Sequence, residues 1–235
     1  MKTPEADIAR WVAGLLQFSD SFYPTGAYAH SFGLEGLVEA GAVRDPATLR
    51  TFLLEQALPI LARTDLPIAA RAWTAAGEPP DWTALRRLSQ LGSSVRGARE
   101  PREASEAIGR QRLELCALHR GGLAAEVTRR AEAEGWPRPA CVAAAIEGRM
   151  IGAPVEAVLA GIVYTASAGL MAAAMKLLRL GQNAAQGLIT EAMAQAPALA
   201  AEALALGAEE IGSFHPWWDI AAARHEKADG RLFIS

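Results

Sequence analysis

Three polar side chains near the N-terminus could perform acid–base chemistry: Asp20, His30 and Glu35 lie within one short stretch of the chain. Carboxylates and imidazoles are the groups that most often act as general acids and bases in enzymes. A helical enzyme with an active site built on these three residues is therefore one interpretation. The other is a polar cluster that braces a turn, because buried polar groups are nearly always hydrogen-bonded.

The sequence lacks the motifs of the common enzyme classes. It has no GxxxxGK[ST] loop, which would cradle the phosphates of a nucleotide. The run 165–169 (TASAG) lacks the first glycine of a nucleophile elbow and lies within a helical pattern, where a strand should precede it. His225 and Glu226 are followed by Lys-Ala-Asp, so they do not complete an HExxH motif. We therefore predict no catalytic residues and favour a binding protein.

The histidines and cysteines do not form a complete metal site. Cys116 and His119 are three residues apart on a predicted helix, but two ligands are half of a site, and a thiol on a helix more often packs. His30 is expected to hydrogen-bond within its own segment. His215 and His225 are ten residues apart, a spacing that no helical face favours. We predict no metal site in this chain and no stably bound cofactor.

Charge and composition exclude several classes of protein. The chain of 235 residues has a formal net charge of −3, which argues against general nucleic-acid binding. Its two cysteines are not arranged as CxxC, so a disulfide-built secreted scaffold is not indicated. Glu5 and Asp7 precede the first apolar segment, and no signal-peptide pattern is present. The expected location is the cytoplasm.

The periodicity of the apolar residues is helical wherever it is clear. A stripe near the N-terminus consists of Ile8, Trp11, Val12, Leu15 and Leu16. Asp45 before Pro46 and Asp81 before Trp82 are typical helix starts, and Pro59 is expected to kink or divide its helix. We predict an all-α fold, with residues 1–235 forming a single-domain bundle of about nine to eleven helices and residues 230–235 an extended C-terminal tail.

The most apolar stretch is 157–175, nineteen residues without a charge. Its length would suit a membrane span, but it contains glycine, serine and threonine and is dominated by alanine. We predict a central helix wrapped by others, ending near Gly181, and no membrane association. A further alanine-rich helix is expected to run from Pro197 to about Gly212.

Residues 19–35, here called the polar segment, are too polar and too broken to be plain core. Pro24 fixes its own φ, the hydroxyl of Thr25 can cap a helix, and Gly26 lacks a Cβ where the chain turns. The sequence predicts a loop that leads into a new helix from about Ala27.

On that helix four residues would share roughly one face. Tyr28, Ser31, Phe32 and Glu35 are spaced at i, i+3, i+4 and i+7. The predicted face mixes aromatic and polar groups.

The stretch 86–112 carries seven arginines and three glutamates. It could be an electropositive docking face for an acidic partner. The alternative is a solvated helix face on which arginines and glutamates pair at i+3 and i+4. This is the more common outcome of such a pattern.

The run 20–35 (DSFYPTGAYAHSFGLE) resembles the signature of the urease accessory protein UreF family. Three further stretches look like the same family in the same order: 99–105 (REPREAS) leading to 109–110 (GR), 178–182 (LRLGQ) and 231–235 (RLFIS). Each piece is short, but the ordered set is specific, and it spans nearly the whole chain.

The resemblance implies a function in urease maturation. Proteins of this family are all-helical, bind the accessory protein UreD (also called UreH), recruit the GTPase UreG and help to load nickel into apo-urease. The chain would then be a non-catalytic chaperone through whose complex nickel passes at most transiently. Family members are dimers in their complexes, so we expect a homodimer with Tyr164 at or near the interface.

The resemblance also implies where partners bind. We expect the polar segment to recruit UreG, and the expected contact residues are Pro24, Thr25, Gly26, Tyr28, His30, Ser31 and Glu35. Arg231 and Phe233 of the C-terminal tail are expected to join them, because a short apolar tail needs docking to become ordered. We expect UreD to order the tail and to bring Arg231 against Tyr28.

Overall fold

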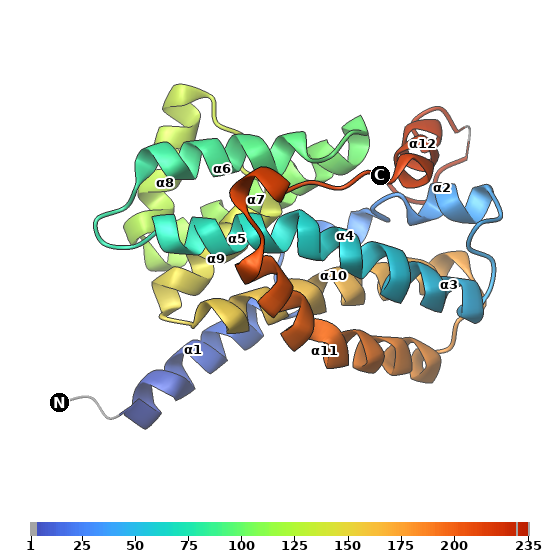
Figure 1. Ribbon diagram of the computed structural model, residues 1–235, viewed down its shortest axis with the longest axis horizontal. Coiled ribbons are helices and arrows are strands. Elements are labelled where there is room, and N and C mark those ends of the chain that lie inside the picture. The colour runs from blue at the N-terminus through green and yellow to red at the C-terminus, as the bar shows by residue number, and fades with distance from the viewer. Residues whose placement is uncertain (1–3, 229, 235) are drawn as a thin grey trace.

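The computed structural model describes residues 4–228 and 230–234, and within these every regular element is helical (Figure 1). The α-helices are α1 (Pro4–Ser19), α2 (Leu34–Glu39), α3 (Pro46–Phe52), α4 (Leu58–Arg63), α5 (Asp65–Ala75), α6 (Trp82–Ser94), α7 (Arg99–Arg120), α8 (Gly122–Glu134), α9 (Ala140–Ile151), α10 (Val155–Leu177), α11 (Gln182–Ala205) and α12 (Pro216–His225). Two 3₁₀ turns (Ala27–Ala29 and Ala208–Glu210) and one π-helical turn (Leu53–Ala57) complete the regular structure. The all-α prediction is confirmed.

The core forms where α5 and α9 cross the middle of the bundle. Both helices are almost wholly buried, and α9 packs against α5, α7, α1 and α10. The small residues of α9 permit this close approach, because a Cβ on Gly148 would lie 2.2 Å from Val158 of α10. Figure 1 shows α10 and α11 along one side of this core and α6, α7 and α8 along the other.

α10 contains the apolar stretch 157–175. By length and composition it could cross a membrane, but half of its most apolar window is buried inside the protein. Its buried side, which includes Leu159, Val163 and Met171, packs on α9, α11 and α1. Its other side leaves Tyr164 (38%) and Met175 (40%) partly exposed.

The local signals for helix starts are confirmed. Asp45 accepts the backbone N–H of Thr48 at 2.8 Å, with Pro46 in the first turn of α3. Asp81 accepts the N–H of Ala84 at 2.9 Å at the start of α6. The expected interruption at Pro59 is also present, as the π-helical turn directly before α4. A proline lacks the N–H that would bond the carbonyl four residues earlier, which explains the irregular turn.

One predicted boundary is wrong. Pro197 does not start a helix but lies inside α11, which runs unbroken from Gln182 to Ala205. The residues that follow the proline, Leu199, Ala200 and Ala203, are buried. α11 packs on α10, α4 and α5. This packing outweighs the one lost hydrogen bond.

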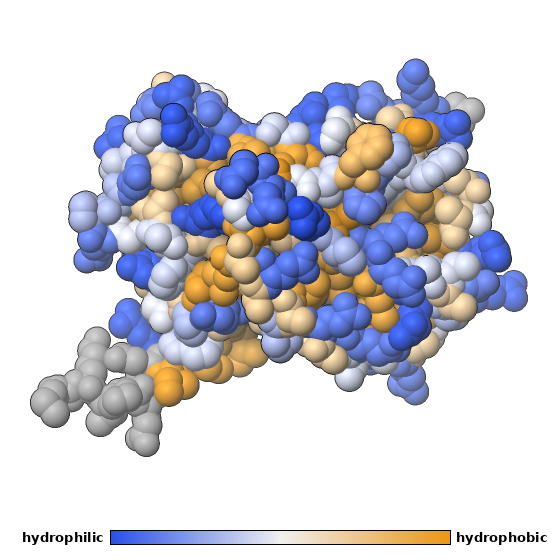
Figure 2. Space-filling model, in the orientation of Figure 1, coloured by the Kyte–Doolittle hydropathy of each residue, from blue (hydrophilic) through white to orange (hydrophobic). Residues whose placement is uncertain are grey.

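The stripe on α1 is only half covered by the bundle. Trp11 and Leu15 pack toward α9 and α10, whereas Ile8, Val12 and Leu16 are exposed by 53%, 37% and 69%. Figure 2 shows hydrophobic colour where α1 leaves the body beside the grey N-terminus. The outward side of α1 from Ile8 onward is therefore an apolar surface that the described residues of this chain do not cover.

Candidate functional site

The polar segment folds as a series of tight turns between α1 and α2. Asp20 accepts the N–H of Phe22 at 2.6 Å, and the hydroxyl of Thr25 accepts the N–H of Ala27 at 3.4 Å. Gly26 has φ 78°, in the left-handed region that side chains disfavour, although a Cβ there would meet nothing within 4 Å. Gly26 is thus required by backbone conformation and not by a close neighbour.

The predicted helix from Ala27 to Glu35 is wrong. A 3₁₀ turn ends at Ala29, and Phe32 and Gly33 both take positive φ (54° and 85°) before α2 begins at Leu34. Two successive left-handed residues reverse the chain, so Tyr28 and Glu35 do not share a face. Tyr28 is exposed by 69%, while Glu35 is buried.

Two glycines fit α2 tightly against α12. A Cβ on Gly33 would lie 2.6 Å from the indole nitrogen of Trp218, which donates to the carbonyl of Phe32 at 2.8 Å. A Cβ on Gly36 would lie 2.4 Å from the carbonyl oxygen of Ala221. This close contact brings the end of α12 directly over α2.

A buried ionic cluster forms at that contact. The imidazole of His225 on α12 lies between Glu35 of α2, at 2.8 Å from Nε2, and Glu100 of α7, at 2.9 Å from Nδ1. Arg231 of the C-terminal tail donates to the other oxygen of Glu100 at 2.7 Å. We call Glu35, Glu100, His225 and Arg231 the His225 cluster. It ties three helices and the tail together.

The C-terminal tail docks on the chain's own body. Glu35 accepts the backbone N–H groups of Leu232 at 2.7 Å and Phe233 at 3.0 Å. The N–H of Ile234 donates to the carbonyl of Ala29 at 2.9 Å, and Phe233 is buried. The tail thus closes over the polar segment and α2.

In the chain by itself Arg231 does not contact Tyr28, the neighbour that we expect for it in a complex with UreD. Arg231 binds Glu100, and the ammonium of Lys176 on α10 instead covers Tyr28, 3.5 Å from its ring centroid. The same ammonium lies 4.8 Å from the ring centroid of Phe233. Two aromatic rings around one cation join α10, the polar segment and the tail.

The geometry of the His225 cluster favours a charged imidazole. A neutral imidazole donates from only one nitrogen, whereas here both nitrogens face carboxylate oxygens. Burial lowers the pKa of His225, but the hydrogen bonds to Glu100 and Glu35, together with their negative charges, outweigh it, so this pKa is raised above 6.5.

A second buried ionic cluster lies beneath the start of the polar segment. Glu147 of α9 is fully buried and accepts the Tyr23 hydroxyl at 3.0 Å and the Arg112 Nε at 2.7 Å. The Arg112 guanidinium also lies 5.6 Å from the centroid of the Tyr23 ring. We call these three residues the Glu147 cluster. It fixes the polar segment to α7 and α9.

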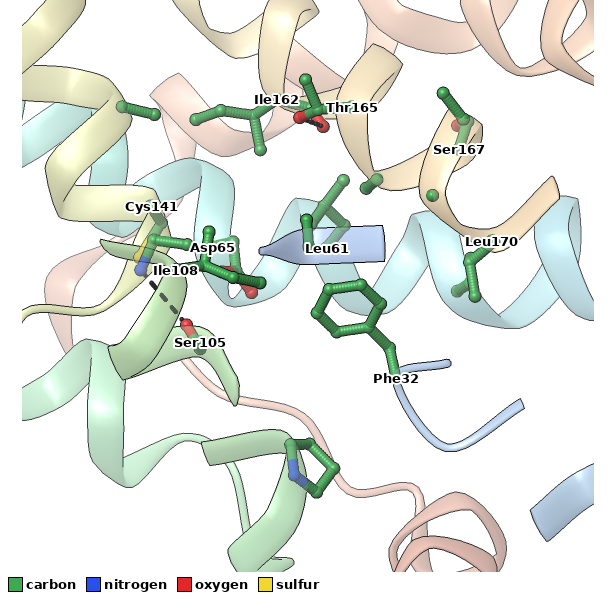
Figure 3. A pocket seen from close by; sticks show the side chains of 18 of the residues that line it. Phe32, Leu61, Asp65, Ser105, Ile108, Cys141, Ile162, Thr165, Ser167 and Leu170 are labelled. Carbon is green, nitrogen blue, oxygen red and sulfur yellow. Dashed lines mark hydrogen bonds between the residues drawn. The ribbon is translucent and has the colours of Figure 1, made fainter. Parts of the chain in front are cut away.

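A cavity of about 470 Å³ lies between the polar segment, α10, α4 and α7. Figure 3 shows the ring of Phe32 reaching toward Leu61 of α4, with Leu170 and Ser167 of α10 to the upper right of this ring. The hydroxyl of Ser167 is buried and has no hydrogen-bond partner, whereas Ser105 accepts the N–H of Ala140 at 3.2 Å. The walls of the cavity are mainly apolar, and much of the polar segment lines it.

Comparison with known proteins decides the family. A model of the UreF family matches residues 43–193, more than half of the chain. The chain belongs to the UreF family. The match does not include the polar segment or the C-terminal tail. Similarity in these two regions is instead covered by relatives that align along almost the whole chain.

The UreF-family relatives are urease accessory proteins. The chain is 33% identical to the urease accessory protein UreF of Methylibium petroleiphilum, over 97% of this chain and 95% of that protein. It is 31% identical to UreF of Cereibacter sphaeroides, over 93% of this chain and 96% of that one. It is also 33% identical to a bifunctional urease accessory protein UreEF of Bordetella bronchiseptica, over 99% of this chain but only 54% of the longer protein.

The residues predicted for partner binding in this UreF-family chain divide into two groups. Pro24, Gly26 and Tyr28 are exposed, and Thr25 is half-buried at the same surface. The buried or half-buried group consists of His30, Ser31, Glu35 and Phe233, and Arg231 reaches from the surface to bind Glu100. The first group presents a surface, and the second supports it from beneath.

The arginine-rich stretch is mostly paired. Arg96 binds Asp65 at 2.5 Å, Arg99 binds Glu226 at 2.6 Å, and Arg112 belongs to the Glu147 cluster. These pairs link α7 and the end of α6 to α5, α9 and α12. Most of these arginines therefore form ion pairs with other residues of the same chain. The interpretation of the stretch as a free electropositive face is not supported.

The metal ligands considered in the sequence do not converge. Within the described part of the chain no group of three or more His, Cys, Asp or Glu side chains is placed to hold an ion. Cys116 is buried against the Met150 sulfur at 3.7 Å, and burial raises the pKa of its thiol to about 11. This thiol is shielded and protonated near neutral pH, which makes it a packing residue.

Proposed function

We propose that this chain is a non-catalytic maturation factor for urease, which binds UreD, recruits the GTPase UreG and assists nickel insertion into apo-urease in the cytoplasm. Membership of the UreF family carries the proposal, supported by relatives named as urease accessory proteins. Nickel would be the cargo of the complex, passed on without a lasting site in this chain.

The exposed part of the polar segment supports a recruiting role. Phe22 is exposed by 92% and Tyr28 by 69%, while the Glu147 cluster and the docked tail hold the backbone beneath them. Aromatic side chains on a rigid support are typical anchors of protein interfaces. We assign this surface to UreG.

Two further apolar surfaces are available for other contacts. Phe214 and Trp217 at the start of α12 are exposed by 85% and 81%, and the outer side of α1 is uncovered. Exposed apolar patches of this kind mark interaction sites. We propose that UreD covers these apolar surfaces on α12 and α1. We also propose that the outer side of α10 around Tyr164 forms a homodimer contact.

The alternative of an enzyme centred on Asp20, His30 and Glu35 has little geometric support. Both oxygens of Glu35 already accept hydrogen bonds from the tail backbone, and one also faces His225. A carboxylate so occupied cannot take a proton from a substrate without undocking the tail. Asp20 stabilises its own turn.

The recruiting role is tested by Gly26→Val in a co-expressed complex with UreD and UreG. The substitution strains a left-handed backbone, so it should weaken UreG capture more than UreD binding. Gly41→Val is the matched control, because Gly41 also has a positive φ (71°) and no neighbour within 4 Å of a Cβ. Equal loss of both partners with Gly26→Val, or the same UreG loss with Gly41→Val, would contradict the assignment.

The dimer contact is tested by Tyr164→Asp. If Tyr164 is buried between two copies, the unpaired carboxylate should dissociate the dimer, as measured by light scattering. Leu118→Asp on α7 is the control, because Leu118 is exposed by 76% and lies outside the proposed contact. A folded Tyr164→Asp protein that remains a dimer would refute the contact.

A further inference from the structure

Glu35 is the anchor of the C-terminal tail. Its Oε1 accepts from Leu232, and its Oε2 accepts from Phe233 and faces His225. Leu232 and Ile234 point their side chains largely to solvent, at 60% and 65% exposure. Apart from Phe233, the tail is therefore held by polar bonds to one carboxylate, one bond to Ala29 and the Arg231 ion pair.

The protonation state of the His225 imidazole decides whether Glu35 and Glu100 can both accept a hydrogen bond from it. With an imidazolium, two carboxylates face two cations, His225 and Arg231, and the buried cluster is neutral. Without that proton, one imidazole nitrogen turns a lone pair toward a carboxylate oxygen less than 3 Å away. Two buried carboxylates then share one cation, which is unfavourable at low dielectric.

The other charged groups near the His225 cluster do not supply the positive charge that a neutral His225 would lack. The charge of Glu100 on α7 also acts on His30 in the polar segment, but burial lowers the pKa of His30 overall, which favours its neutral form. Arg99 and Glu226 pair with each other at 2.6 Å on the exposed edge between α7 and α12. Lys176 of α10 lies over the Phe233 ring.

We propose that His225 is a protonation latch: its imidazolium holds residues 231–234 on α2 and the polar segment, and loss of its proton releases them. Release would withdraw Phe233 from Lys176 and so change the surface beside Tyr28. The latch itself rests on the contacts of this chain alone. Its consequence for partner recruitment rests on the proposed function.

The test compares two titration curves within the unmodified full-length protein. NMR spectra recorded from pH 5.5 to 9.5 would follow the ring nitrogens of His225 and, in the same samples, the backbone order of Leu232 and Phe233. We expect the tail amides to be ordered at low pH and mobile at high pH, with the same midpoint as the His225 ring. One pH unit beyond the midpoint about 90% of the imidazole is neutral, so the change should be nearly complete there.

Two variants sharpen the test. His225→Gln removes the titrating group and its positive charge, so the tail should be mobile at every pH. His30→Gln removes the neighbouring imidazole and should leave the midpoint unchanged. The comparison within the unmodified protein remains valid even if His225→Gln does not fold.

Three outcomes would overturn the latch. The tail could stay ordered while the His225 ring loses its proton, the ring could remain protonated up to pH 9.5, or the tail transition could persist in folded His225→Gln. Binding of UreD and UreG across the same pH range is a separate measurement. Tail release at the ring's midpoint without any change in partner binding would support the latch and contradict the assigned recruiting surface.

Discussion

The two buried ionic clusters differ in what they hold. The Glu147 cluster joins α9, α7 and the polar segment, which are anchored by many other contacts, and its cation is an arginine that keeps its charge. The His225 cluster joins α2, α7 and α12 to a chain end, and one of its cations is an imidazole. Similar hydrogen-bond geometry therefore gives a permanent brace in one place and a conditional one in the other.

Among the substitutions that test this comparison, Glu147→Ala should cause the largest loss of unfolding free energy. The substitution leaves the Arg112 guanidinium buried without its carboxylate and the Tyr23 hydroxyl without its acceptor. Loss of one partner of a buried pair typically costs about 3–5 kcal/mol of unfolding free energy. Chemical denaturation would measure it, and a loss below about 1 kcal/mol would show that the Glu147 cluster is no brace.

Gly36→Ala tests the tight contact that supports the His225 cluster. The added methyl group would meet the Ala221 carbonyl at 2.4 Å, so we expect a loss of about 1–3 kcal/mol of unfolding free energy. Gly187→Ala in α11 is the control, because its Cβ meets nothing within 4 Å, and it should gain up to about 1 kcal/mol. Equal effects of the two substitutions would argue against the close packing of α2 and α12.

Stability should depend on pH through the His225 cluster. The raised pKa of His225 in the folded chain means that its contribution is fully present below pH 6.5 and is lost as the pH rises through the folded pKa. Unfolding free energies between pH 6 and 9 should therefore fall for the unmodified protein and change less for His225→Gln. A parallel decline in both proteins would assign the pH dependence to another group.

Arg231→Ala should have the smallest effect on stability. The Arg231 side chain is 38% exposed, so its ion pair with Glu100 contributes about 1 kcal/mol or less, and the melting temperature should barely change. The tail should nevertheless become more mobile, because it then loses its ion pair with Glu100. Hydrogen exchange at Leu232 and Phe233 would detect this, and unchanged protection would show that the tail is held without the Arg231 ion pair.

Local signals in the sequence predicted the helical fold well. The caps at Asp45 and Asp81 and the interruption at Pro59 depend on chemistry within a few residues, so the sequence alone is sufficient. The continuation of α11 through Pro197 depends on packing against other helices, which no local pattern reveals. Propensity yields to tertiary contacts at such positions.

The candidate site was predictable only in part. The run 20–35 identified the polar segment, but the helical spacing of Tyr28 and Glu35 was misleading, because Phe32 and Gly33 reverse the chain between them. Glu100 and His225 were missed as partners. They are 125 residues apart, and one isolated histidine gives no sign of the two carboxylates that surround it.

The docked tail also has a practical meaning for anyone who labels this protein. Ile234 is bonded to Ala29, so a purification tag or fluorescent protein fused to the C-terminus would begin beside the polar segment. Figure 1 shows the first turn of α1, which begins at Pro4, at the opposite end of the molecule from the tail. An N-terminal fusion would therefore keep its bulk away from Tyr28, and pull-down results obtained with the two tag positions should not be treated as equivalent.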